Sequence, residues 1–101
     1  MSLNVHGLPA VYGVLNGAYN KGSSPGVFIH SCYPPGRIIR EKGKFWRIIA
    51  GLVKASGTVA RTPDDQQGEM PPTQATWELY QMDDQTFVPH SISIEALNAG
   101  S

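Results

Sequence analysis

Glycine and proline interrupt this chain so often that its secondary structure has to come in short pieces. The 101 residues include 11 glycines and 8 prolines, spread along the sequence without a period. Proline cannot continue a helix or a central strand, and glycine weakens both. Apolar residues recur at spacings of three and four in no segment long enough for an ordinary helix. The pattern predicts an all-β domain.

Segments of alternating apolar residues mark the strands between these breaks. In Lys44–Ala50, Trp46 and Ile48 share one face, and Trp77 and Leu79 do the same in a later segment. Burying an aromatic ring of this size removes roughly 150–250 Å² from water, so we expect both tryptophans in the core rather than on a stacking platform. The segment of Trp77 and Leu79 is Thr76–Gln81, and the other predicted strands lie within Leu3–His6, Gly13–Lys21, Val27–Ser31, Arg37–Arg40, Ser56–Arg61 and Phe87–Glu95.

Seven or eight short strands joined mostly by turns predict an antiparallel meander, which closes as a small barrel or folds over as a sandwich. The length fits a single domain, 1–101, with an ordered core over about 3–96 and a long exposed loop at 62–75. We expect Leu3–His6 at a sheet edge and a type I′ hairpin turn at Asn16-Gly17. A short helical turn would fit residues 95–99 or the long loop.

Charge is unevenly distributed although the chain carries no formal net charge. Residues 1–63 hold all eight lysines and arginines and one acid, whereas residues 64–101 hold the other seven acids. Such asymmetry indicates either a basic binding half or opposite charges that face one another across a sheet. We favour the second explanation, because a small sheet brings both halves together.

A single cysteine, Cys32, excludes an internal disulfide and favours a reducing environment. The N-terminus lacks a signal-peptide pattern, and no apolar run approaches the 18 residues that a membrane span needs. We therefore expect a small soluble domain, intracellular and without membrane contact.

Turn and aromatic residues recur in an order that resembles a module of roughly 90 residues. This β module is repeated in multidomain proteins of unicellular algae and oomycetes and has no established activity. The matching segments cover nearly the whole chain and are Asn16–Tyr19, Gly26–His30, Gly43–Ile48, Pro71-Pro72, Thr76–Tyr80 and Val88-Pro89. These positions specify a fold rather than a chemistry, so the resemblance implies an accessory interaction domain.

His30 and Cys32 are the candidates for chemistry, two residues apart on one predicted strand face. They could begin a metal site with His6 or His90, or form a nucleophile and its base. A metal needs three or four converging donors, and only two are local. We therefore favour a structural role for both residues and expect no metal, no other cofactor and no catalytic residue.

Basic residues crowd the predicted hairpin 37–47, and they are the candidate binding residues: Tyr33, Arg37, Arg40, Lys44 and Arg47. Basic side chains beside aromatic rings could bind a nucleic acid, but nucleic-acid-binding domains usually have a strongly basic isoelectric point.

The sequence thus favours a non-enzymatic module that binds a protein or small molecule through residues 62–75, residues 31–36 or an exposed strand. The alternatives are a nucleic-acid-binding domain that uses the hairpin 37–47, and a small enzyme or metal protein centred on His30 and Cys32. An edge strand would also allow homo-oligomers to form.

Overall fold

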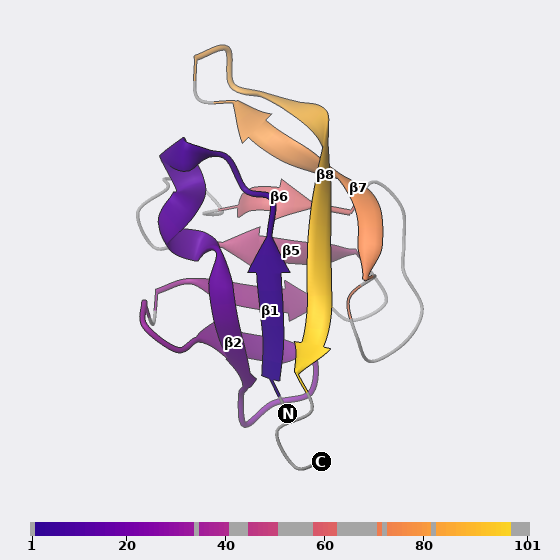
Figure 1. Cartoon of the computed structure of the whole chain (residues 1–101). Helices are drawn as coiled ribbons and strands as arrows, with labels where there is room; N and C mark the ends of the chain where they lie inside the picture. The colour runs from indigo at the N-terminus through magenta and orange to yellow at the C-terminus, as the bar shows by residue number, and fades with distance from the viewer. Residues whose placement is uncertain are drawn as a thin grey trace.

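The chain folds into a closed antiparallel barrel in which each strand pairs with the next and the last pairs with the first (Figure 1). The computed structural model describes residues 2–33, 35–40, 45–50, 58–62, 71, 73–81 and 83–97. The elements are β1 (Ser2–His6), η1 (Ala10–Leu15), β2 (Gly17–Lys21), β3 (Val27–His30), β4 (Arg37–Arg40), β5 (Trp46–Ile49), β6 (Thr58–Arg61), β7 (Gln74–Gln81) and β8 (Thr86–Leu97). The all-β prediction is confirmed, and the barrel is the correct one of the two predicted architectures.

The last strand closes the barrel because it is longer than its neighbours. Residues Thr86–Ser93 of β8 pair with β7, and residues Ser93–Leu97 pair with β1. The prediction that Leu3–His6 lies at a sheet edge is therefore wrong, since β1 has β2 on one side and β8 on the other. Because both sides of β1 are paired, β1 offers no free edge for the predicted self-association.

Apolar side chains fill the barrel, as the alternation predicts. Trp46 and Trp77 are fully buried, and each contributes about 4–6 kcal/mol if burial of its area is counted at 25 cal/mol per Å². Neither indole nitrogen has a hydrogen-bond acceptor in the described part of the chain, so apolar packing holds both rings. The other buried apolar residues are Leu3, Val5, Leu8, Tyr12, Leu15, Tyr19, Phe28, Ile38, Ile48, Ala50, Val59, Ala60, Leu79, Ile92 and Ile94.

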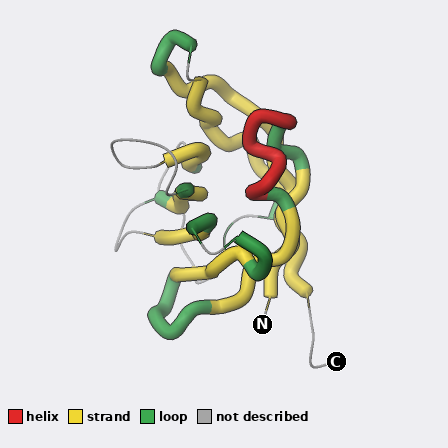
Figure 2. The backbone as a smooth tube through the Cα atoms, turned by 90° about the vertical axis from the view of Figure 1, so that its left-hand side faces the viewer, coloured by secondary structure: helices red, strands yellow, loops and turns green. Residues whose placement is uncertain are grey.

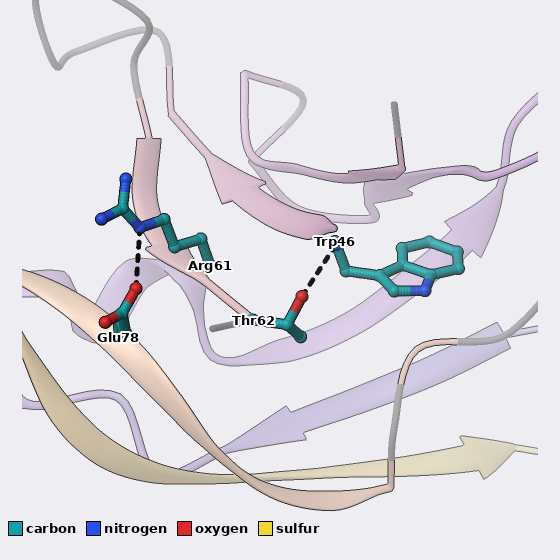
Figure 3. A network of polar contacts seen from close by, with 4 residues as sticks. All are labelled: Trp46, Arg61, Thr62 and Glu78. Carbon is teal, nitrogen blue, oxygen red and sulfur yellow. Dashed lines mark hydrogen bonds and ion pairs between the residues drawn. The ribbon is translucent and has the colours of Figure 1, made fainter. Parts of the chain in front are cut away.

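Thr62 joins β5 to the end of β6 inside this core. Its hydroxyl accepts a hydrogen bond of 3.0 Å from the backbone N–H of Trp46, and its own N–H donates to the Trp46 carbonyl at 3.0 Å (Figure 3). The side chain is buried, so the predicted exposed loop 62–75 does not begin at Thr62. It also ends earlier than predicted, because β7 begins at Gln74. Residues 63–70 and 72 of that loop lie outside the described residues.

The predicted hairpin turn at Asn16-Gly17 is wrong. Strand β1 ends at His6 and β2 begins at Gly17, and residues 7–16 connect them through η1. Gly17 does adopt a positive φ of 112°, which favours glycine, but it does so at the start of a strand. The helical turn predicted for residues 95–99 does not form in their described part, because β8 continues as a strand to Leu97. Residues 98–101 lie outside the described residues.

Two short turns join neighbouring strands. Gly22 N–H donates to the carbonyl of Val27 at 2.7 Å and closes the turn between β2 and β3. Asp83, Asp84 and Gln85 form the turn between β7 and β8. No helix in the described residues is long and apolar enough to cross a bilayer.

Candidate interaction surface

Connections in a meander alternate between the two ends of the barrel. The β1–β2 connection with η1, the β3–β4 connection and the β7–β8 turn share one end, which we call the η1 end (Figure 1). The β2–β3 turn and the β6–β7 connection belong to the opposite end. Of the two segments predicted to bind partners, the described residues of 31–36 therefore lie at the η1 end, and Thr62 and Thr73, which flank the part of 62–75 that lies outside the described residues, belong to the opposite end.

Asn16 fastens the two sides of the β1–β2 connection together. Its Oδ1 accepts from the N–H of Leu8 at 3.1 Å, and its Nδ2 donates to the carbonyl of Leu8 at 3.1 Å. This pair of bonds imitates one rung of an antiparallel ladder, with a side chain in place of a strand. These two bonds give the β1–β2 connection a defined shape, although η1 is the one short helical segment described in it.

His30 extends this bracing to the β3–β4 connection. Its Nε2 donates to the carbonyl of Asn16 at 2.7 Å, and its Nδ1 accepts from the N–H groups of Cys32 and Tyr33, both at 3.0 Å. A nitrogen that accepts two backbone N–H groups carries no proton, so the hydrogen bonds assign a neutral ring with its proton on Nε2. The ring also packs edge-on against Tyr19 at 4.8 Å between centroids.

This geometry leaves His30 without a free ring nitrogen for a metal or for proton transfer. Cys32 lies beyond the end of β3, where its exposed thiol approaches the Ser31 hydroxyl at 3.8 Å. The two histidines predicted as further metal ligands make other contacts. His6 Nε2 lies 3.8 Å from the Glu95 carboxylate, and His90 Nε2 donates to the Gly7 carbonyl at 2.6 Å. Among the described residues, no three histidine, cysteine or acidic side chains are grouped to hold a metal.

Two tyrosine hydroxyls hold η1 in place through hydrogen bonds to backbone carbonyls. Tyr12 donates to the Tyr80 carbonyl of β7 at 2.8 Å, and Tyr19 donates to the Leu15 carbonyl (Figure 2 shows η1 beside the β7–β8 hairpin). Burial, and to a smaller extent the neighbouring Tyr80, raises the pKa of Tyr12. Burial alone raises the pKa of Tyr19. Both hydroxyls thus favour the neutral state in which they donate.

The secured segment turns two valines to solvent. Tyr12 and Leu15 of η1 are buried, whereas Val11 and Val14 are 63% and 54% exposed. A kink at Tyr12 interrupts the regular helical backbone, but the alternation between a buried and an exposed side persists. Sequence reasoning missed this surface, although Pro9 and the spacing of three between Tyr12 and Leu15 were signals of a short helix.

The structure does not gather the predicted binding residues into one cluster. Alternation along β4 puts Arg40 on the inner face with Ile38, where its Nε is buried, and puts Arg37 on the outer face, where it is exposed. Arg47 of β5 lies on the outer face and donates to the Thr58 hydroxyl at 3.2 Å. Lys44 lies outside the described residues.

Tyr33, the remaining candidate binding residue, packs against the core. Its ring packs partly buried against the core and approaches His30 at 6.5 Å between centroids. Its hydroxyl is buried and finds no hydrogen-bond partner in the described part of the chain. The side chain therefore offers little contact area to a ligand.

Arg61 of β6 explains part of the charge asymmetry. Its Nε lies 3.0 Å from the Glu78 carboxylate on β7 (Figure 3). Its guanidinium carbon lies 3.8 Å from the centroid of the Phe87 ring on β8. Phe87 in turn packs against Tyr80 at 5.3 Å. For this pair the favoured explanation is confirmed: a basic residue from the first part of the chain faces an acid from the second across the sheet.

A polar hollow of about 450 Å³ lies beside β8, lined by Thr73, Ser93, Ile94, Glu95 and Ala96. This hollow could not be predicted from the sequence, because it depends on the unequal lengths of β7 and β8.

Comparisons with known protein families, with curated proteins and with solved structures found no match for this chain. The resemblance to the algal and oomycete module stays a prediction.

Proposed function

We propose that this chain is a non-catalytic interaction module that binds a protein partner through η1. The observation that supports this proposal is the exposure of Val11 and Val14 on a short segment whose other side is buried. Apolar side chains that remain in water at this exposure gain free energy when a partner covers them.

The bracing around η1 supports the same function. Hydrogen bonds made by Tyr12, Tyr19 and His90 hold η1 and its flanking residues to β7, β2 and β8. The Asn16 side chain joins the two ends of the connection to each other. A surface that is already ordered loses little conformational entropy when it binds, so a small apolar contact can still contribute to affinity. The hydrogen bonds of His30 likewise serve to hold backbone and leave no ring nitrogen for acid–base chemistry.

The experiment compares two variants with wild type in affinity capture. Val11→Ser/Val14→Ser removes the exposed alkyl groups of η1, and Val88→Ser makes the same change at an exposed valine of β8. A protein captured by wild type from extracts of the producing cells is then purified and titrated against all three. Covering a fully exposed valine contributes about 1.5 kcal/mol, and Val11 and Val14 are each a little more than half exposed, so the double variant should bind about tenfold more weakly. Equal affinity of the double variant and the Val88→Ser control would exclude η1 as the binding surface.

A second candidate function is nucleic-acid binding by the outer face of β4–β6. Arg37 and Arg47 share this face, and Arg47 lies directly opposite Arg61 in the ladder. Such a site would bind a single-stranded oligonucleotide with an affinity that falls steeply with added salt, and Arg37→Ala would reduce that slope. Absence of binding at low salt would eliminate this candidate.

A further inference from the structure

Asn16 is followed by glycine, and no other asparagine of the chain is. Such a pair can react with itself, because the backbone nitrogen of the second residue can attack Cγ of the asparagine side chain. A bond forms between that nitrogen and Cγ, the Cγ–Nδ2 bond breaks, and the side-chain amide leaves as ammonia with the proton of the attacking N–H. Water then opens the five-membered succinimide ring to aspartate or isoaspartate. Glycine favours the attack because it has no Cβ beside its nitrogen.

The fold holds the Asn16 side chain away from this reaction. Its Oδ1 accepts from the N–H of Leu8 and its Nδ2 donates to the carbonyl of Leu8, each at 3.1 Å. The backbone at Asn16 is extended, with a φ of −70° and a ψ of 158°. Ring closure needs the Gly17 nitrogen and the Asn16 Cβ to be nearly eclipsed about the Cα–C bond, and this ψ keeps them apart. The amide therefore has to leave Leu8, and the backbone has to turn, before Gly17 can attack.

His30 holds the attacking nitrogen through the same peptide group. Its Nε2 donates to the Asn16 carbonyl at 2.7 Å, which fixes the plane of the peptide between Asn16 and Gly17. In a trans peptide the N–H points away from the carbonyl, so the Gly17 N–H points away from His30. Because β2 lies between β1 and β3, this direction is toward β1, where Val5 is opposite Gly17 in the ladder. Attack requires the nitrogen to turn out of this position and lose its proton.

We propose that Asn16 is a self-modification site, a deamidation site that the β1–β2 connection keeps closed. Deamidation occurs when the connection opens far enough to release the Asn16 amide and the Gly17 nitrogen together, while the barrel stays folded. Both residues are half-buried, so water reaches the site as the reactant that opens the ring. Opening a connection costs less free energy than unfolding the barrel, because connections belong to the least stable parts of a fold.

Neither product restores the pair of bonds to Leu8. Aspartate has no N–H, so a carboxylate oxygen would face the carbonyl of Leu8, and two acceptors repel one another. Isoaspartate adds a methylene group to the backbone between η1 and β2. Deamidation therefore loosens the η1 end irreversibly and limits how long η1 presents Val11 and Val14 in a fixed position. This inference goes beyond the proposed function and stands without it, because its readouts are a covalent change and the stability of the chain.

The first experiment incubates the chain at mildly alkaline pH, in native buffer and in urea concentrated enough to unfold it. Peptide mapping by mass spectrometry follows the replacement of NH₂ by OH at each asparagine. Asn16 should be the main site in urea and should react at least about tenfold more slowly in the folded chain. Equal rates in the two conditions, or a different main site in urea, would overturn the proposal.

Two variants distinguish local opening from unfolding of the whole barrel. His30→Phe removes the bond to the Asn16 carbonyl, whereas Ile48→Ala leaves a cavity in the core at β5, and both lower stability. After each rate is divided by the measured population of unfolded chain, a common value for both variants and wild type would refute local opening. Local opening predicts that the folded His30→Phe chain deamidates about fivefold faster than wild type, the effect of one net hydrogen bond on an opening equilibrium.

Wild type alone decides the point if either variant fails to fold. Its deamidation rate should be constant at low urea concentrations, where the unfolded population rises but local opening changes little. A rate that rises in proportion to the unfolded population would contradict the proposal.

The purified deamidated chain tests the consequence for the fold. Its Tm should be at least about 4 °C lower than that of fresh chain, which is the effect of one lost net hydrogen bond in a domain of this size. Asn16→Asp should reproduce the aspartate product. Asn20→Asp is the matched control, because it keeps the acceptor for the Ser2 hydroxyl and should leave Tm unchanged. An unchanged Tm of the deamidated chain would show that Asn16 does not hold the connection.

Discussion

Replacing His30 with phenylalanine tests the bracing of the η1 end most sharply. The ring is 6% exposed and makes three hydrogen bonds to backbone groups of Asn16, Cys32 and Tyr33. Phenylalanine keeps an aromatic ring beside Tyr19 but leaves those three groups without a partner. At about 1 kcal/mol for each net hydrogen bond, His30→Phe should lower the free energy of unfolding by about 3 kcal/mol. For a domain of this size that corresponds to a fall in Tm of about 12–24 °C.

The assay is urea denaturation with thermal denaturation in parallel, both at pH 7. Tyr33→Phe is the matched control, because the hydroxyl it removes is buried and has no partner in the described residues. The control should leave stability unchanged or raise it slightly, since a buried unpaired polar group is destabilising. If His30→Phe costs less than about 1 kcal/mol, or no more than Tyr33→Phe, the bracing role of His30 is refuted.

Three further predictions concern packing, backbone conformation and pH. Gly36→Ala places a Cβ 2.8 Å from Leu15 Cδ2 and should lower the free energy of unfolding, measured in urea, by about 1–3 kcal/mol. An unchanged free energy of unfolding would show that the η1 end packs more loosely than described. Gly17→Ala puts a residue with a side chain at a φ of 112° and should lower the free energy of unfolding by at least about 1 kcal/mol. A higher free energy of unfolding would contradict that backbone conformation. Because the pKa values of Tyr12 and Tyr19 are raised in the folded state, the stability they contribute is complete below the unfolded-state pKa of about 10 and is lost as pH rises above it. Unfolding free energies measured from pH 8 to 12 should therefore fall above about pH 10, less so in Tyr19→Phe, and a flat profile would contradict the burial of both hydroxyls.

Strands were predictable from the sequence because their signal is local. Trp46 with Ile48, and Trp77 with Leu79, alternate with outward residues, and a period of two identifies which side is buried. Closure of the barrel was not predictable, because it depends on pairing between β1 and β8, the two ends of the chain. Local alternation is the same in a barrel and in a sandwich.

The helical segment and the binding surface were harder to predict, for different reasons. The Tyr12 hydroxyl holds η1 through a bond to the carbonyl of Tyr80, which is 68 residues away, so local propensity gives little sign of this helix. The basic cluster was inferred from closeness in sequence, but alternation separates Arg40 from Arg37 and Arg47 across the sheet. Residues close in sequence therefore did not form one surface.

Contact between β1 and β8 is the feature on which the closed barrel and the burial of both indoles depend. Nuclear Overhauser effects between Hα protons measure it directly, because paired residues that do not exchange hydrogen bonds bring their Cα atoms to about 4.5 Å. The closed barrel predicts strong Hα–Hα signals between Val5 and Ile94 and between Leu3 and Ala96. If these two signals are absent while those of the other ladders are present, the sheet is open and the account is wrong.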